Sequence, residues 1–324
     1  MAIAIVMSHL GLVTHAIGSV AVYTFLTLSG FVVGSSLLRL DPKKLHQFFL
    51  NRALRVWVPY YLSILMLIVA SVLHEDILTA KWFEFVIYKI TFVYNLFGEV
   101  QIAQVIEHSP LQGTGDYVWS INLQEQFYLL APLLLVLTPA KFGKSTLLWF
   151  FLAAVAWVGQ FYPSLFFGVL LAVSLHNQQV LPGRAVQAGL FVVSAYAFVC
   201  TSIHSYLIVP FLNVAIVMLL TNNGPKNPKA ELFGGMSLQL YLNAWIGTFL
   251  VNGVLKYAEI EPNILTKLIT VVVSIMIAIG LYLLIDKRLI INRQKISSLI
   301  NAKLVTFVSY FLVSLGVIYG LTLH

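Results

Sequence analysis

Residues 119–138 read WSINLQEQFYLLAPLLLVLT, an apolar run that opens with one carboxylate and three side-chain amides. A continuous apolar run of about 20 residues is what an α-helix needs to cross the hydrocarbon core of a bilayer. On such a helix Asn122, Glu125 and Gln126 lie at i, i+3 and i+4 and share a face, with Gln124 beside it. Polar groups are costly at membrane depth unless they meet a partner or a cavity. The helix is therefore predicted to turn this face toward the protein interior.

The rest of the chain has the composition of a membrane protein. Of its 324 residues, 60% are hydrophobic and 10% are charged, and the mean hydropathy is +0.91. About a quarter of the residues of a soluble domain are charged. The apolar runs are continuous rather than alternating, which favours helices over the strands of a membrane barrel. The sequence therefore predicts an all-α fold, a polytopic transmembrane helical bundle.

Apolar runs between polar breaks predict about eleven membrane spans. They lie at 1–14, 17–38, 57–74, 119–138, 145–160, 163–177, 186–202, 204–221, 232–253, 265–286 and 303–322. The polar segment 75–118 is long enough to hold an interfacial helix around 81–97. We predict a ten-span core domain over residues 1–290, followed by a linker and one additional C-terminal span over residues 291–324.

The basic residues predict an orientation in the cell membrane. With the N-terminus in the cytoplasm and the C-terminus outside, fifteen Lys and Arg residues fall on the cytoplasmic side. The outer side receives four, namely Lys81, Lys89, Lys256 and Lys267. This split agrees with the positive-inside rule. The outer segment is instead acidic, with Glu75, Asp76, Glu84, Glu99, Glu107 and Asp116.

Two other classes of site are excluded by the composition. The net charge of +7 is scattered between apolar runs, and no basic face interleaved with aromatic residues indicates a nucleic-acid partner. Cys200 is the single cysteine, which excludes an internal disulfide and a cysteine-based metal cage.

Polar or small residues inside the first two predicted spans are candidates for function. His9 lies in MSHLGLVTHA, where a histidine is either a functional group or a side chain at a wet helix end. Ser29, Gly30 and Gly34 form a small-residue face, which by itself indicates only that another helix approaches closely.

Two arginines precede the third predicted span. Arg52 and Arg55 are three positions apart in HQFFLNRALRVWVPYY and share a helix face. They anchor the helix at the cytoplasmic surface, or they form a clamp that binds a phosphate-bearing ligand at the same surface. Burial would raise the pKa of a carboxyl group such as Glu125 unless a cation pairs with it, and an arginine would serve. Without a ligand, the polar face of 119–138 would be a hydrogen-bonding knot that holds helices together.

Taken in order, these segments resemble the membrane acyltransferase 3 family. The family has a histidine in its first span, then S-G-F, then F-x-x-R-x-x-R-hydrophobic-x-P-Y, then W-S-L-x-x-E-x-Q-F-Y-L-L-x-P. It continues with F-x-x-G-x-x-L-A and S-x-x-L-Y-L-x-H-x-P. The matching segments here are AIAIVMSHLG (2–11), FLTLSGF (25–31), FLNRALRVWVPYY (49–61), WSINLQEQFYLLAP (119–132), FYPSLFFGVLLA (161–172) and GGMSLQLYLNAW (234–245). The resemblance covers residues 2 to 290.

The resemblance implies an enzyme that moves an acyl group, commonly acetyl, from an acyl-CoA to a hydroxyl of a carbohydrate or lipid-linked glycan. Acyl-CoA would be the donor substrate, with no bound cofactor and no metal. His9 would be the general base or a transient acyl carrier, and Glu125 the second catalytic candidate. Arg52 and Arg55 would bind the phosphates of the donor. The substrate passage would be lined by Trp119, Ser120, Gln124, Gln126, Tyr128 and Tyr241.

Several positions depart from the family pattern. The family's arginine before the histidine would fall about two residues ahead of Met1, so either the first helix is thinly anchored or the natural start lies upstream. Gln124 stands at the family's glutamate, and Ala244 stands at a family histidine, whereas Asp286 matches an acidic residue of a late span. Two alternatives therefore stay open, a non-catalytic relative that binds a glycan or a partner, and a transporter of a lipid-linked sugar.

Overall fold

The computed structural model describes most of the chain, namely residues 1–74, 79–98, 109–114, 116–177, 182–200, 205–221 and 227–323. It leaves out the side chains of Gln112, Tyr117, Ala140, Ser205 and Tyr206. Regular structure in the described ranges is helical throughout, with no strand, which confirms the all-α prediction. Some charged residues used in predicting the orientation lie outside the described residues, namely Glu75, Asp76, Glu99, Glu107 and Lys226.

Most of the predicted spans appear as apolar helices. Among the described residues, six helical segments are long and apolar enough to cross a membrane, namely His15–Leu38, Pro42–His74, Trp119–Leu137, Pro228–Tyr257, Ile264–Ile291 and Ala302–Leu323. Four shorter apolar helices lie at Thr146–Val158, Pro163–His176, Arg184–Cys200 and Leu207–Thr221. Large apolar side chains stay exposed along these helices, for example Leu147, Val199 and Phe307. Such surfaces suit lipid rather than water, so the chain is a helical membrane protein.

The N-terminal region differs from its prediction. Residues 1–14 do not form one helix, because α1 (Ala2–His9) is followed by a turn in which Gly11 has a φ of 66°, and α2 (His15–Leu38) begins after it. Eight residues rise only about 12 Å, which is too short to cross a bilayer.

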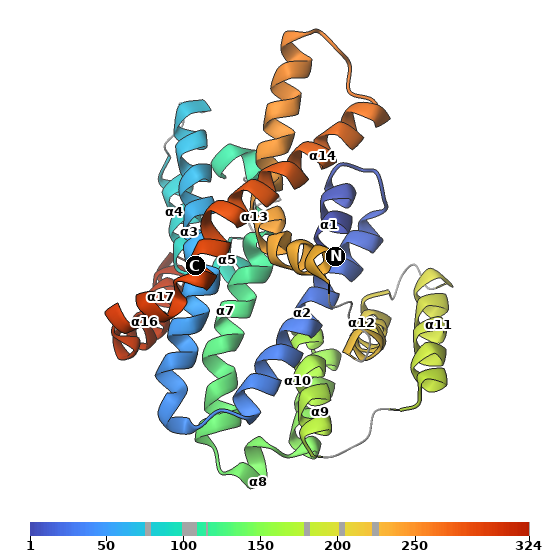
Figure 1. Cartoon of the computed structure of the whole chain (residues 1–324), viewed down its shortest axis with the longest axis vertical. Helices are drawn as coiled ribbons and strands as arrows, with labels where there is room; N and C mark the ends of the chain where they lie inside the picture. Colours follow the sequence, from blue (N-terminus) through green and yellow to red (C-terminus); the bar gives the residue numbers. More distant parts are fainter. Residues whose placement is uncertain are drawn as a thin grey trace. The chain divides into compact units, whose positions relative to one another are not determined.

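The chain divides into two compact units, shown together in Figure 1. The first is formed mainly by residues 3–42 and 130–227, and the second by residues 43–129 and 228–324. Besides α1 and α2, the first unit contains the π-helical η5 (Leu133–Leu137), α8 (Ala140–Gly143), α9 (Thr146–Val158), α10 (Pro163–His176), α11 (Arg184–Cys200) and α12 (Ser205–Thr221).

The first unit is organised by a close approach of α2 and α10. A Cβ atom added to Gly30 would lie 2.2 Å from the carbonyl oxygen of Leu165, and one added to Gly168 would lie 2.1 Å from that of Thr27. Only glycine fits at both positions, so the small-residue face predicted at Gly30 is confirmed as a helix contact. Thr24 of α2 also lies 2.7 Å from Asn213 of α12, oxygen to oxygen.

The second unit contains the remaining helices. They are η1 (Pro42–Lys44), α3 (Leu45–His74), α4 (Ala80–Ile90), α5 (Tyr94–Phe97), η3 (Pro110–Gly113), η4 (Asp116–Val118), α7 (Trp119–Pro132, to Leu129 in this unit), α13 (Pro228–Tyr257), α14 (Ile264–Leu281), the π-helical η6 (Tyr282–Asp286), α15 (Lys287–Ile291), α16 (Arg293–Leu299) and α17 (Ala302–Leu323).

Hydrogen bonds to backbone carbonyls hold α3 against its neighbours. The hydroxyls of Tyr60 and Tyr61 donate to the carbonyl oxygens of Lys89 and Ile90 at the end of α4, over 2.7 and 2.9 Å. In the same unit the hydroxyl of Tyr310 in α17 donates to the carbonyl oxygen of Leu129 in α7.

The helix predicted around 81–97 is present as two pieces, α4 and α5, separated by a turn in which Phe92 has a φ of 58°. The apolar side of α4 is buried within the second unit, with Trp82 and Phe85 in its core.

Candidate functional site

A buried ion pair joins α3 to α7 in the second unit. Arg52 Nε lies 3.6 Å from Glu125 Oε1, and only 18% and 9% of the two side chains are exposed. The indole N–H of Trp57 donates to Glu125 Oε2 over 3.0 Å. The cation beside Glu125 is thus an arginine, Arg52, from the segment that precedes Pro59.

The two arginines of that motif have different surroundings. The Arg52 guanidinium lies over the ring of Tyr128, 2.9 Å from its centroid, as well as beside Glu125. Arg55, one turn further along α3, is exposed. Arg52 therefore has protein partners that hold it in place, whereas Arg55 is open to a ligand. The Tyr128 hydroxyl also donates to Gln124 Oε1 over 2.8 Å, so the residue at the family's glutamate position is held by its own helix.

The remaining amides of α7 form a knot with α3 and α5. Asn122 Nδ2 donates to the Tyr60 hydroxyl over 2.8 Å, and Asn122 Oδ1 accepts the backbone N–H of Tyr94. Gln126 Nε2 lies 2.6 Å from the carbonyl oxygen of Phe92 and 2.7 Å from Asn95 Oδ1. These two amides accordingly act as helix-packing groups, and within the polar face only Glu125 carries a charge.

The other predicted passage residues lie near the start of α7. The hydroxyls of Ser120 and of Tyr241 in α13 are 2.7 Å apart, and both side chains are buried. Trp119, the first residue of α7, is half-buried. The structure thus brings Ser120 and Tyr241 together.

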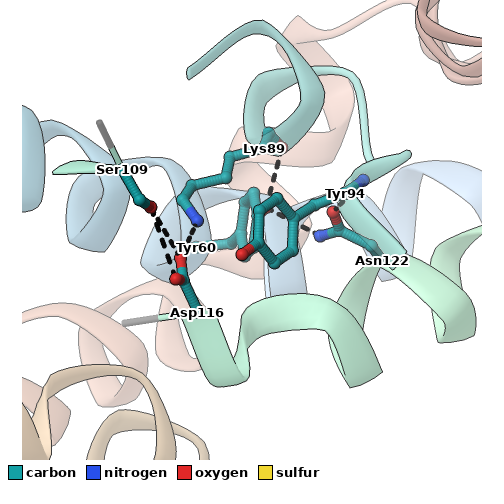
Figure 2. Close-up of polar contacts among 6 residues, drawn as sticks. All are labelled: Tyr60, Lys89, Tyr94, Ser109, Asp116 and Asn122. Carbon is teal, nitrogen blue, oxygen red and sulfur yellow. Dashed lines mark hydrogen bonds and ion pairs between the residues drawn. The ribbon is translucent and has the colours of Figure 1, made fainter. Parts of the chain in front are cut away.

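A second buried ion pair lies at the N-terminal end of α7, as Figure 2 shows. Lys89 of α4 is fully buried, pairs with Asp116, and lies 3.6 Å from the centroid of the Tyr94 ring. The Ser109 hydroxyl donates to Asp116 over 3.3 Å. Burial lowers the pKa of the Lys89 ammonium, and the Asp116 carboxylate opposes this shift. Burial also raises the pKa of Asp116, against the effect of Lys89.

Sequence reasoning missed this pair because it used both charges only to predict orientation. The signal was present in the helical period. Lys89 follows Trp82 by seven positions and Phe85 by four, which puts it on the apolar side of α4. A charge on an apolar helix face is expected to be buried and paired.

His9 belongs to the first unit and is exposed at the end of α1. The preceding Ser8 is buried, and its hydroxyl donates to the carbonyl oxygen of Thr14 over 3.4 Å. A Cβ atom added to Gly18 of α2 would lie 2.4 Å from Ser8 Oγ. The close packing of Ser8 on Gly18 fixes the end of α1 and leaves the imidazole accessible. Among the described residues, no group of three or more His, Cys, Asp or Glu side chains could hold a metal ion.

The apolar helices define a polytopic helical membrane protein, and its second unit holds both buried ion pairs. A family model described as an acyltransferase domain matches residues 1–323 of the chain. The chain belongs to this family, the acyltransferase 3 family, as its motifs indicated. Comparisons with curated proteins and with solved structures found no match.

Proposed function

We propose that the protein is an integral-membrane acyltransferase that moves an acyl group, acetyl in the simplest case, from acyl-CoA to a hydroxyl of a carbohydrate or lipid-linked glycan. In a cell envelope this reaction would be O-acetylation of a polysaccharide. The family match supports acyl transfer at the level of reaction class. The donor and the acceptor are our proposal.

The observation that carries the proposal is the Arg52–Glu125 pair with its Trp57 hydrogen bond, in helices suited to cross the membrane. A buried ion pair is weak evidence for stability, because desolvation of two charges offsets most of their attraction. Ionisable residues within membrane helices are instead characteristic of functional sites.

The proposed chemistry needs one base and one stabilised leaving group. The acceptor hydroxyl oxygen attacks the thioester carbonyl carbon, its proton passes to His9, and the carbon–sulfur bond breaks to release coenzyme A as a thiolate that then takes up a proton. An imidazole suits the base because its ordinary pKa is near 6.5. Partial burial, and then the nearby His15, lower the pKa of His9, which favours the neutral form that can accept a proton. His9 is exposed, as a base that meets a large acceptor must be.

The basic residues are assigned to different tasks. Arg55 is exposed and is our candidate for contact with the phosphates of the donor. Arg52 lies 3.6 Å from Glu125 and is proposed to orient it, so the loss of Arg52 would act through Glu125. Ser120 and Tyr241, with Trp119, Gln124 and Tyr128, are the proposed lining of the passage between the donor and acceptor sides. The hydrogen bonds of Gln126 to Phe92 and Asn95 favour a packing role for that residue instead.

The test is transfer of radiolabelled acetyl from acetyl-CoA to glycan in membranes that contain the protein. Transfer should disappear in His9→Ala and persist in His176→Ala, because His176 is also an exposed histidine at the end of a helix of the first unit but lies outside the family motif. Equal loss in both variants would contradict the role of His9. Absence of transfer from any acyl-CoA to any glycan would contradict the proposed function.

A non-catalytic relative is the second candidate, and two positions favour it. Gln124 replaces the family's glutamate and is used to accept the Tyr128 hydroxyl. Ala244 replaces a family histidine, and its carbonyl oxygen accepts the hydroxyl of Ser274. Such a protein would bind the glycan without transferring label, so glycan binding without transfer would favour this candidate.

A further inference from the structure

Three buried polar side chains, Asp286 of η6 with Gln239 and Asn243 of α13, form a file in the second unit, apart from the Arg52–Glu125 pair. Gln239 Nε2 donates to Asp286 Oδ1 over 2.8 Å, and Asn243 Nδ2 donates to Gln239 Oε1 over 2.8 Å. Asp286 is 9% exposed, and Gln239 and Asn243 are each 1% exposed. The file thus begins at the Asp286 carboxylate in the π-helical η6, continues to Gln239, and ends at Asn243, one helical turn after Gln239 in α13.

The carboxylate fixes the direction of every hydrogen bond in this file. An ionised carboxylate can only accept, so Gln239 must present its NH₂ group to Asp286 and its oxygen to Asn243. Asn243 must then present its own NH₂ group to Gln239. Its Oδ1 atom is left as an acceptor, and it is buried without a hydrogen-bond donor among the residues that the structure describes.

The neighbouring contact between α13 and α14 offers no spare donor. A Cβ atom added to Gly247, one turn beyond Asn243, would lie 2.2 Å from Ser274 Oγ. That hydroxyl already donates to the carbonyl oxygen of Ala244 over 3.0 Å. A buried acceptor without a donor costs about 1–3 kcal/mol, so this atom calls for a ligand or a bound water.

The position of the file indicates which ligand would reach it. Both η6 and α15 contact α3, the helix that carries Arg55, and Lys287 and Arg288 follow Asp286 directly. The file therefore leads inward from a basic end of the unit, which is the cytoplasmic end in the predicted orientation. A donor that enters there would leave its phosphates at the basic end and extend its uncharged part along the file.

We propose that Asn243 Oδ1 accepts a hydrogen bond from the pantetheine arm of the acyl-CoA donor. This inference rests on the proposed function. The arm carries amide N–H groups and hydroxyls, which are the donors that the open oxygen lacks, and it connects the nucleotide phosphates to the thioester. Asn243 is a binding residue for the arm, and Gln239 and Asp286 position its amide.

The test is equilibrium binding of two ligands to the purified full-length protein in lipid nanodiscs. The ligands are coenzyme A and its nucleotide portion, which has the phosphates but lacks the arm. Asn243→Leu should weaken binding of coenzyme A about tenfold, as expected for a lost hydrogen bond, and leave binding of the nucleotide portion unchanged. Arg55→Gln should weaken binding of both ligands.

Ser274→Ala is the matched control, because it removes a buried hydrogen bond from the same pair of helices without touching the file. It should leave binding of both ligands unchanged. If Asn243→Leu does not fold, Gln239→Leu replaces it, since it frees the Asn243 amide to rotate and should weaken coenzyme A alone by a smaller factor.

Unchanged affinity of Asn243→Leu for coenzyme A would overturn the inference and would assign the open acceptor to water or to helix packing. Equal losses for the two ligands would also overturn it, since they would indicate a general disturbance. No binding of coenzyme A by the unaltered protein would overturn the donor in the proposed function itself. Binding that is insensitive to Asn243 therefore leaves the proposed function standing.

Discussion

The ammonium group of Lys89 is fully buried and forms an ion pair with the Asp116 carboxylate. Lys89→Met alone should lower the free energy of unfolding by about 3 kcal/mol or more, because it leaves the Asp116 carboxylate buried without its cation. The double variant with Asp116→Asn should be more stable than the sum of the two single losses implies. Chemical unfolding in detergent, followed by circular dichroism, measures all four proteins of the cycle.

Lys81 supplies the control for this cycle. It also belongs to α4 and pairs with Glu84 over 2.8 Å, but 30% of its side chain is exposed. Lys81→Met should lower the free energy of unfolding by about 1 kcal/mol at most, as is usual for exposed pairs. If Lys89→Met were no more destabilising than Lys81→Met, the buried pair would not hold α4 to the start of α7.

Trp57 lets the role of Glu125 be tested without changing its charge. Trp57→Phe keeps a ring against Phe92, 5.8 Å away between centroids, and removes only the N–H that Glu125 accepts. We expect acyl transfer to fall about tenfold, since a carboxylate that loses one charged hydrogen bond is less well oriented. Glu125→Gln should lower transfer by about 100-fold or more if the carboxylate acts in catalysis.

Initial rates of label transfer measure both effects, and Trp82→Phe controls for loss of a buried indole hydrogen bond. The Trp82 indole donates to the Ser71 hydroxyl over 2.9 Å, away from Glu125. Full activity in Glu125→Gln would exclude a catalytic role and leave Glu125 as a packing group.

At the scale of helices, the contact of α2 with α10 depends on two glycines. Gly30→Ala or Gly168→Ala would place a methyl group about 2 Å from a backbone carbonyl oxygen, so the helices must separate. We expect a loss of about 1–3 kcal/mol in the free energy of unfolding for each, as for other overpacked contacts. Thermal unfolding in detergent detects a loss of this size.

Gly189 of α11 distinguishes this contact from the general effect of alanine in a helix. No atom lies within 4 Å of a Cβ added there, so Gly189→Ala should be neutral or stabilising. Equal melting temperatures for Gly30→Ala and Gly189→Ala would mean that α2 and α10 do not approach as closely as the structure indicates.

At the scale of the whole molecule, the sequence predicted what hydrophobicity and helical period determine. It located the apolar helices, the shared polar face of α7 and the close approach at Gly30. It did not distinguish Arg52 from Arg55, because both lie on one helix face, and a spacing of three residues does not indicate which of the two side chains contacts α7. It also missed the Lys89–Asp116 pair, because the helical period places Lys89 on the apolar side of α4 but does not indicate that its partner is Asp116, 27 positions further along the chain.

The orientation of the protein is a further expectation at this scale. The α14–α15 segment, Ile264–Ile291, is about 42 Å long, so its two ends should lie on opposite sides of the bilayer. The turn that precedes it contains the exposed Glu261, and the basic segment that follows it contains the exposed Lys295. Because basic segments are retained in the cytoplasm, we expect Glu261 outside and Lys295 inside. In a Cys200→Ser background, a membrane-impermeant maleimide should label Glu261→Cys in intact cells and Lys295→Cys only after permeabilisation. The reverse pattern would invert the protein in the membrane and would put the basic end proposed to receive acyl-CoA on the side away from the cytoplasm.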